Sequence, residues 1–374
     1  MRFTSKTGGA LGAVTLALGL SALSAPAYAA PIACDAAVLV SAVKAANAAG
    51  GGTIHLAANC VYTLHGSIPG QVRGANGLPV IRERITIKGD NSVIERSSAP
   101  GTPEFRIAEV GGTKGDLTLN GVTLRNGNLA GGGEGGAVYV NDHRVLTVKS
   151  SILTNNTAAT GGGAIRNNGT ATITGSIVSD NHARAGGGIY AYGDTTTIVS
   201  STVSGNEAVF GGGIGNEISK LTLRSSDVRD NSASSQGGGI INLANATLAV
   251  ENSQIRDNSG GAFGGGVSNF GKVTMSGSSV RGNSAADAGG IANSGTLDVN
   301  SSRIDGNRAD SWGGGLSNYA GTATLTGTSV TGNSAVEAGG IYEYSGMVAL
   351  VSSPVTTNTP NNCRPEVTLP GCTD

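Results

Sequence analysis

The sequence predicts an all-β fold: a single-stranded parallel β-helix with coils of about 25 residues and a short helix at its N-terminal end. Two observations predict this fold. An asparagine returns at intervals of 24 to 27 residues, most often 25, from the middle of the chain to its end. A glycine run closed by an aliphatic residue returns with the same period. A repeat of this length sets the architecture of the whole array before any local motif does.

One copy of the repeat spans Ser201 to Ile214 and reads STVSGNEAVFGGGI. Its asparagine, Asn206, lies three residues after Val203 and is followed by a short variable loop and the glycine run. The asparagine column consists of Asn156, Asn181, Asn206, Asn231, Asn258, Asn283, Asn307, Asn333 and Asn358. We expect these amides to lie at a turn and to hydrogen-bond along the stack as a structural ladder.

Each copy contains three short apolar segments. One follows the glycines, one consists of two aliphatic residues ten and eight positions before the asparagine, and one is the V-x-x-N motif itself. The spacing of two predicts strands with one buried face. A doubly wound α/β fold is excluded because no helical pattern separates the strands. A β-propeller is excluded because about 25 residues cannot supply a four-stranded blade.

The first 29 residues predict a secretory signal peptide. Arg2 and Lys6 precede an apolar run from Ala10 to Leu23, and Ala27-Tyr28-Ala29 has the form of a cleavage site. The run is too short to anchor the chain in a bilayer, so we expect no transmembrane segment in the mature chain. We therefore expect a secreted, extracellular or cell-surface protein.

The rest of the chain divides into four predicted parts. Residues 30–64 form an N-terminal cap and first strands, with a helix from Asp35 to Ala49. Residues 65–116 form irregular first coils, 117–358 the regular coils, and 359–374 a C-terminal tail or cap. The helix is expected to cover the exposed edge of the first strands.

Four cysteines lie outside the repeats: Cys34, Cys60, Cys363 and Cys372. An even count in an exported protein indicates disulfides, and four cysteines permit three pairings. The two near pairs are the simplest choice and would clamp the two ends of the array. A metal site is the weaker interpretation, because neither pair has C-x-x-C spacing or a neighbouring histidine.

The composition restricts the partners. The chain has 374 residues, 62 of them glycine, and only 4% are aromatic, which indicates a thin repetitive core. Loss of Arg2 and Lys6 with the signal peptide changes the formal net charge from -1 to -3. A mildly acidic protein has no electrostatic reason to bind nucleic acid.

The GG-[GA]-[ILV] and V-x-x-N motifs in register resemble those of the pectin-lyase-like superfamily of right-handed parallel β-helices. The array looks most like the polymorphic outer-membrane protein repeats, although the phenylalanine of their F-x-x-N motif is aliphatic here in every copy. The resemblance covers about Leu117 to Asn358. It implies a right-handed coil and a surface or secreted protein, often an adhesin, and it implies no particular activity.

Three carboxylates are the candidate catalytic residues. Asp287, Asp310 and Glu337 lie in three successive loops between asparagine and glycine run. Asp287 and Glu337 occupy equivalent positions two coils apart, so strand spacing places their backbones on the order of 10 Å apart, with Asp310 between them. Such a trio suits acid–base work on a glycan, or Ca²⁺ binding under that enzymatic interpretation. The alternative is three solvated loop carboxylates that keep the surface soluble.

Four aromatic residues are the candidate ligand-binding residues. Tyr192, Phe270, Tyr319 and Tyr344 each lie three residues after the aliphatic residue that closes a glycine run. Outward-facing rings in this column would stack on sugars, whereas the alternative is that they close the turn beside the strand.

The sequence therefore favours a non-catalytic adhesin-like or glycan-binding protein. The alternative is a polysaccharide lyase or glycoside hydrolase that acts on an extracellular polysaccharide. The expected partner is an extracellular polysaccharide or a host or cell surface. We expect no cofactor and no metal.

Overall fold

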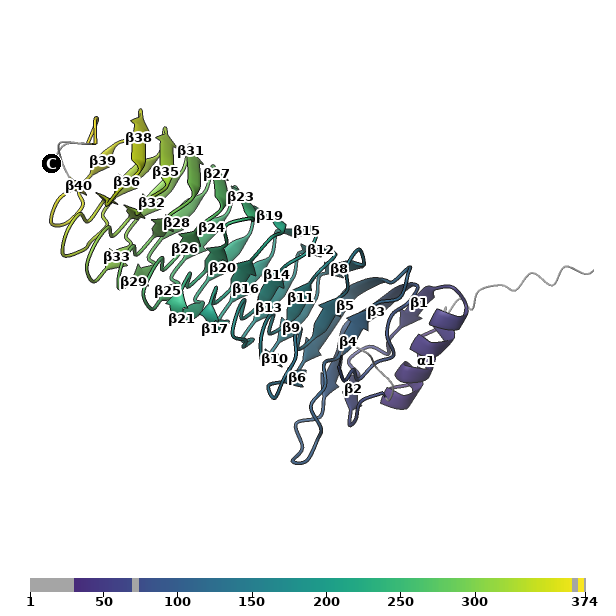
Figure 1. Cartoon of the computed structure of the whole chain (residues 1–374). Helices are drawn as coiled ribbons and strands as arrows, with labels where there is room; N and C mark the ends of the chain where they lie inside the picture. Colours follow the sequence, from purple (N-terminus) through teal and green to yellow (C-terminus); the bar gives the residue numbers. More distant parts are fainter. Residues whose placement is uncertain (1–29, 69–73, 365–368, 373–374) are drawn as a thin grey trace, which may run out of the picture.

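The computed structural model describes residues 30–68, 74–364 and 369–372. They form an elongated stack of coils with α1 (Ala36–Ala48) at one end and the last strands at the other (Figure 1). Every pairing between named strands is parallel, as in Ile165↔Ile189 and Ile189↔Ile214. The predicted parallel β-helix is confirmed, including its period of about 25 residues. The expected signal peptide lies outside the described residues.

An 11-stranded sheet receives one short strand from each coil. Its strands are β4 (Ala108–Val110), β7 (Val138–Val140), β11 (Ile165–Asn167), β14 (Ile189–Ala191), β18 (Ile214–Asn216), β22 (Ile240–Asn242), β26 (Val267–Asn269), β30 (Ile291–Asn293), β34 (Leu316–Asn318), β37 (Ile341–Glu343) and β40 (Cys363–Arg364). The first and third residues of each strand point into the coil, and the middle residue points outward, because successive side chains of a strand alternate.

A 22-stranded sheet contains the other two predicted strands of each coil. Its first row contains the paired aliphatics: β8 (Val145–Lys149), β12 (Thr170–Thr174), β15 (Thr195–Val199), β19 (Lys220–Arg224), β23 (Thr247–Glu251), β27 (Lys272–Ser276), β31 (Thr296–Asn300), β35 (Thr322–Thr326) and β38 (Met347–Val351). Its second row contains the V-x-x-N segments: β9 (Ile152–Thr154), β13 (Ile177–Ser179), β16 (Thr202–Ser204), β20 (Asp227–Arg229), β24 (Gln254–Arg256), β28 (Ser279–Arg281), β32 (Arg303–Asp305), β36 (Ser329–Thr331) and β39 (Val355–Thr356).

The loop between asparagine and glycine run also forms strands, which the repeat did not predict. They are β6 (Asn128–Leu129) paired with β10 (Thr157–Ala158), and a five-stranded sheet of β17 (Glu207–Phe210), β21 (Ser232–Gln236), β25 (Ser259–Gly260), β29 (Ser284–Ala285) and β33 (Arg308–Ala309). The loops are therefore stacked in register as well, which orders the side chains that they carry.

Aliphatic columns and two asparagine ladders fill the interior. Asn206 donates to the Oδ1 of Asn231 at 2.9 Å, and Asn231 donates in the same way to Asn258 at 2.9 Å. The ladder runs without a break from Asn156 to Asn358. A second ladder runs along the 11-stranded sheet from Asn216 to Asn318. Buried amides are tolerated here because each one is hydrogen-bonded by the next coil.

The N-terminal end is closed by α1. Asp35 caps this helix by accepting from the backbone N–H groups of Ala37 and Val38 at 2.6 and 3.1 Å. Leu39 and Val43 are fully buried against the first coil, whereas Val38 is 37% exposed. The helix packs on β1 (Gly52–His55), β2 (Val61–Leu64) and β3 (Arg84–Arg96).

The described part of residues 65–116 includes β3 and β4. β3 runs for 13 residues and pairs in parallel with β5 (Asp116–Arg125), for example Ile85↔Leu117. The glycine motif is missing there, but the alternating aliphatic pattern is sufficient to continue the 22-stranded sheet. The two disulfides join the near pairs, Cys34 to Cys60 and Cys363 to Cys372, at opposite ends of the array. No helix in the described part of the chain is long and apolar enough to span a membrane.

Candidate functional site

The outer face of the 11-stranded sheet carries three parallel columns of side chains, which we call the sheet face. The floor column contains the middle residue of each strand from β11 to β37: Arg166, Tyr190, Gly215, Ile241, Ser268, Ala292, Ser317 and Tyr342. The loop column contains the residue before each glycine run: Ala185, Phe210, Gln236, Phe263, Asp287, Trp312 and Glu337. The turn column follows each strand: Asn168, Tyr192, Glu217, Leu243, Phe270, Ser294, Tyr319 and Tyr344.

Tyr190 and Glu217 are paired on this face. The Tyr190 hydroxyl donates to a carboxylate oxygen of Glu217 one coil further on. The ring lies over Gly215, where an added Cβ would approach Tyr190 Cδ2 to 2.6 Å, so only glycine fits there. Burial, followed by the hydrogen bond to Glu217, raises the pKa of Tyr190, so its hydroxyl stays protonated in neutral solution.

Two buried arginines support this part of the floor. The Arg166 guanidinium lies 4.6 Å from the ring centroid of Tyr190 and 4.5 Å from that of Tyr192, and it pairs with Glu134 at 3.3 Å. Arg106 pairs with Glu109 at 3.4 Å. Burial lowers the pKa of Arg106, and Glu109 opposes that shift. Both cations are therefore already compensated by protein carboxylates.

A hollow of about 530 Å³ lies beside the Tyr190–Glu217 pair. Its lining consists of Ala185, Tyr190, Phe210, Glu217, Ile218, Gln236, Ile241, Leu243, Ala244, Asn245 and Phe270. The lining is mostly apolar and aromatic, with a few polar groups, as is typical of sites that bind organic ligands.

Asp287 lies further along the loop column between aromatic residues. It pairs in register with Phe263, and the next coil brings Trp312 beside it through the Ala288–Trp312 backbone hydrogen bond of 2.9 Å. One oxygen of Asp287 is buried without a hydrogen-bond partner, as is the hydroxyl of Tyr319. Burial raises the pKa of Asp287, while the Ser311 side chain and the Trp312 backbone lower it.

The three predicted carboxylates do not all come together. Asp287 and Glu337 both lie in the loop column, and the residue between them in that column is Trp312. Asp310 does not lie in the loop column. Asp310 is two residues earlier in its loop, where it is exposed and pairs with Arg308 at 3.0 Å. That loop has one residue more between its asparagine and its closing aliphatic residue than the loops before and after it, which shifts its register.

The four predicted aromatic residues do share one column, the turn column. Tyr344 is 72% and Phe270 38% exposed, so these rings are open to solvent. Tyr192 and Tyr319 are half-buried, and Tyr319 packs edge-on against Phe263 at 5.6 Å between centroids. Some rings of this column therefore pack against the face and others are open to solvent, and their role as ligand-binding residues stays a prediction.

The sequence reasoning missed Arg166 and Tyr190 in the floor column, and it missed Glu217 in the turn column. A signal was present, because the residue directly after each glycine-run aliphatic must point outward if the aliphatic points inward. Applying that alternation to the repeat would have identified Tyr190 and Arg166.

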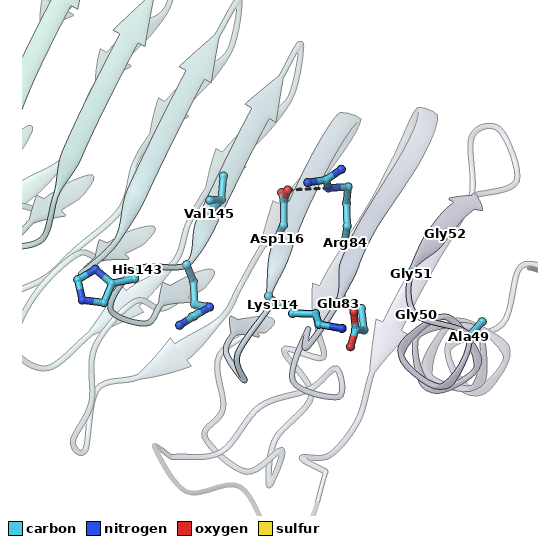
Figure 2. Close-up of a pocket in the computed structure, with 12 residues that line it drawn as sticks. Ala49, Gly50, Gly51, Gly52, Glu83, Arg84, Lys114, Asp116, His143 and Val145 are labelled. Atoms are coloured by element: carbon cyan, nitrogen blue, oxygen red, sulfur yellow. Dashed lines mark hydrogen bonds and ion pairs between the residues drawn. The ribbon is translucent and has the colours of Figure 1, made fainter.

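A second hollow of about 710 Å³ lies near the N-terminal end, beside the loop that follows α1. Figure 2 shows the Arg84–Asp116 pair within it, joined at 3.1 Å, and Lys114 beside Glu83. Its charged groups include both signs and it has no aromatic lining. We therefore place the candidate site on the sheet face.

The described residues contain no cluster of three His, Cys, Asp or Glu side chains with the geometry to bind a metal ion. Asp287 and Glu337 are separated by Trp312, so the sheet face offers single carboxylates instead of a chelating set.

Comparisons with known proteins agree with the fold. No curated protein matches the chain significantly. Among solved structures, the A-module of the mannuronan C-5 epimerase AlgE6 from Azotobacter vinelandii is similar, with a TM-score of 0.58 and 15% sequence identity over 88% of this chain and 93% of that one. At that identity the likeness shows the fold alone. The family model described as "Right handed beta helix region" matches residues 161–352, slightly more than half of the chain, and the chain therefore belongs to the right-handed β-helix family.

Proposed function

We propose that the protein is secreted or cell-surface bound and holds an extended extracellular polysaccharide along the sheet face without cleaving it. The observation that carries the proposal is the double line of aromatic rings. Phe210, Phe263 and Trp312 form one wall, and Tyr192, Phe270 and Tyr344 belong to the other. Aromatic rings with an apolar face and a polar edge suit the faces of sugar rings.

The direction of the face also supports a polymer. Its columns run along the stack with one position per coil, so equivalent contacts repeat at roughly 4.8 Å intervals. A compact ligand needs one hollow, whereas a chain of similar units can use every coil.

Export is supported by the two disulfides, because such bonds persist in oxidising compartments. We place the cleavage of the signal peptide after Ala29. A repeat array that holds a surface glycan acts as an adhesin, which agrees with the role implied by the likeness to polymorphic outer-membrane protein repeats.

The test compares two exposed isoleucines by glycan-array binding and titration calorimetry. Ile218 lies in the hollow and is 47% exposed, whereas Ile177 on β13 is 42% exposed and lies on another sheet. We expect Ile218→Ala and Phe270→Ala to weaken glycan binding and Ile177→Ala to leave it unchanged. Equal effects of Ile218→Ala and Ile177→Ala, or no binding to any glycan, would contradict the proposal.

A second candidate function, polysaccharide cleavage or epimerisation, is favoured by the Tyr190–Glu217 pair beside the hollow. In such a reaction Tyr190 would give its proton to the leaving oxygen, and the Glu217 carboxylate would take a proton from the substrate or from an attacking water and then pass it to the phenolate. The candidates Asp287 and Glu337 lie further along the same face.

The assay for this candidate incubates neutral, amino and acidic polysaccharides with the protein and measures new reducing or unsaturated ends. The epimerised product is followed by NMR. Under the binding proposal we expect no product. Product formation that Tyr190→Phe or Glu217→Gln abolishes would replace the binding proposal by catalysis.

A further inference from the structure

The C-terminal half of the sheet face contains a carboxylate between two pairs of aromatic rings. We call this region the Asp287 patch and define it as Phe263, Asp287, Trp312, Tyr319, Glu337 and Tyr342. Trp312 and Tyr342 are stacked with an interplanar angle of 14° and centroids 5.6 Å apart. Phe263 and Tyr319 meet edge-on at the same centroid distance.

The geometry of the stack brings these rings together around Asp287. Phe263 and Trp312 come from the loops one coil before and one coil after it. Tyr319 starts from the opposite wall and crosses the floor over small residues of the preceding coils to reach Phe263. Trp312 remains 39% exposed, so the patch has an open side.

The patch has an excess of negative charge. No ion pair among the described residues includes Asp287 or Glu337. Burial raises the pKa of Tyr342, and the nearby carboxylates of Glu337 and Asp287 contribute to that shift. Arg308 nearby already pairs with Asp310, and Arg364 lies three coils beyond Asp287 with interactions of its own.

The end of the sheet face nearer α1 does not compensate this negative charge. Arg106 and Arg166 are buried and paired with Glu109 and Glu134, so they offer no free positive charge to a ligand. Glu217 contributes another carboxylate beside the hollow. A polyuronate lying along this face would meet uncompensated carboxylates at several coils.

From this arrangement, and resting on the proposed function, we infer that the polysaccharide carries free amines, and that an ammonium group of an amino sugar binds at Asp287 against the rings of Trp312 and Tyr319. A carboxylate accepts a charge-assisted hydrogen bond from an ammonium group. An aromatic face within about 6 Å attracts the same cation. Neither contribution is available to an N-acetylated neutral sugar, and a uronate is repelled.

The experiment measures binding of three oligosaccharides of equal length by titration calorimetry in slightly acidic, low-salt buffer. The ligands are a glucosamine oligomer, its fully N-acetylated counterpart and an oligouronate. We expect the glucosamine oligomer to bind at least about tenfold more tightly than the acetylated one, and the oligouronate not to bind. Asp287→Asn should remove the tenfold preference and leave binding of the acetylated oligomer unchanged, whereas Asp310→Asn should change neither.

The outcomes separate this inference from the proposed function. Equal binding of the amino and acetylated oligomers, or stronger binding of the oligouronate, overturns the inference and leaves polysaccharide binding in place. Binding of none of the three, with none on a wider glycan array, overturns the proposed function. Loss of the preference in Asp310→Asn as well as in Asp287→Asn would also overturn the inference. The preference would then depend on the net charge of the protein and not on a contact at Asp287.

Discussion

At the scale of single residues, two kinds of buried polar side chain have opposite effects. The ladder asparagines stabilise the fold because each amide has partners on the neighbouring coil. Asp287 has a buried oxygen without a partner, so burial of its carboxylate costs free energy that the fold does not recover.

Substitution of Asp287 tests this cost. Its pKa is raised above the ordinary value of 3.8, so the folded protein holds the proton more tightly than the unfolded chain does. The group therefore reduces stability as the pH rises through its folded pKa, and it has no such effect below its unfolded pKa. We expect Asp287→Asn to have a higher Tm than the native protein at neutral pH, a difference that disappears in strong acid.

The control for this measurement is Asp310→Asn, which removes an exposed carboxylate paired with Arg308 and should not raise the Tm. If Asp287→Asn melts at or below the native Tm at neutral pH, the carboxylate is stabilising and the interpretation of its burial is wrong.

Substitution of a central ladder residue should be strongly destabilising. Asn231 accepts from the backbone and side chain of Asn206 and donates to Val203 and Asn258, all at 2.9 to 3.0 Å. Asn231→Ala leaves several buried groups unpaired, so we expect a loss of about 2–4 kcal/mol in the free energy of unfolding, measured by urea denaturation. The exposed Asn300, at the end of β31, gives the matched control Asn300→Ala, which should change stability by less than about 0.5 kcal/mol.

At the scale of elements, the glycine runs allow the loops of successive coils to approach closely. A Cβ on Gly212 would lie 2.4 Å from the backbone oxygens of Gly238 and Ser232, well inside contact distance. Glycine is required at position 212 for steric reasons and not for its backbone conformation, because Gly212 does not have a positive φ. The coils can therefore stack closely only because these positions are glycine. The spacing of the aromatic residues that precede the glycine runs follows from this close stacking.

Two glycine substitutions separate sterics from backbone preference. The Cβ of Gly212→Ala would push against the backbone of the next coil. At Gly332, by contrast, φ is +65° and no atom lies within 4 Å of an added Cβ. We expect Gly332→Ala to lose about 1–2 kcal/mol from the left-handed conformation and Gly212→Ala to lose more. Thermal denaturation of both variants checks the order, and a milder effect at Gly212 would show that the coils can spread at little cost.

The two disulfides should differ in their contribution to stability. Cys34–Cys60 closes a separation of 26 residues and Cys363–Cys372 one of 9. By chain entropy alone, the longer loop should stabilise by about 0.9 kcal/mol more. We expect the Cys34→Ser/Cys60→Ser double variant to lose more stability than Cys363→Ser/Cys372→Ser. Hydrogen exchange should show the loss of protection beginning in the first coils in the former variant and in the last coils in the latter.

At the scale of the whole molecule, the solenoid converts a local repeat into a long surface. Each coil contacts its neighbours, so the sheet face extends over the 11 strands, a length of roughly 50 Å at strand spacing. The charges are distributed unevenly along it, with compensated arginines toward α1 and uncompensated carboxylates toward the C-terminal end.

Ligand length should therefore matter for binding. Under the proposed function, affinity for a glycan should rise with each added sugar until the oligomer spans the aromatic part of the face, from Tyr192 to Tyr344, and should then become constant. Titration of an oligomer series measures this rise. An affinity that is already maximal for a disaccharide would indicate a single compact subsite instead of an extended face.

The repeat explains how much of the fold could be predicted from the sequence. Columns such as Val203, Asn206 and Ile214 predicted the coil, the strands and the ladder because the same residue types in the same order must occupy equivalent places in each coil. The turn column with Tyr192 and Tyr344 could be recognised for the same reason.

The sequence by itself thus determined the period, the inward columns and the helical cap, since all of these depend on local pattern, whereas it left the cysteine pairing open. Only the tertiary structure decided which outward side chains meet. Tyr190 reaches Glu217 across coils, and Trp312 replaces Asp310 between Asp287 and Glu337. The physical reason is that loop lengths vary from copy to copy, so the register of a loop side chain is set by stacking against neighbouring coils and not by its distance from the asparagine.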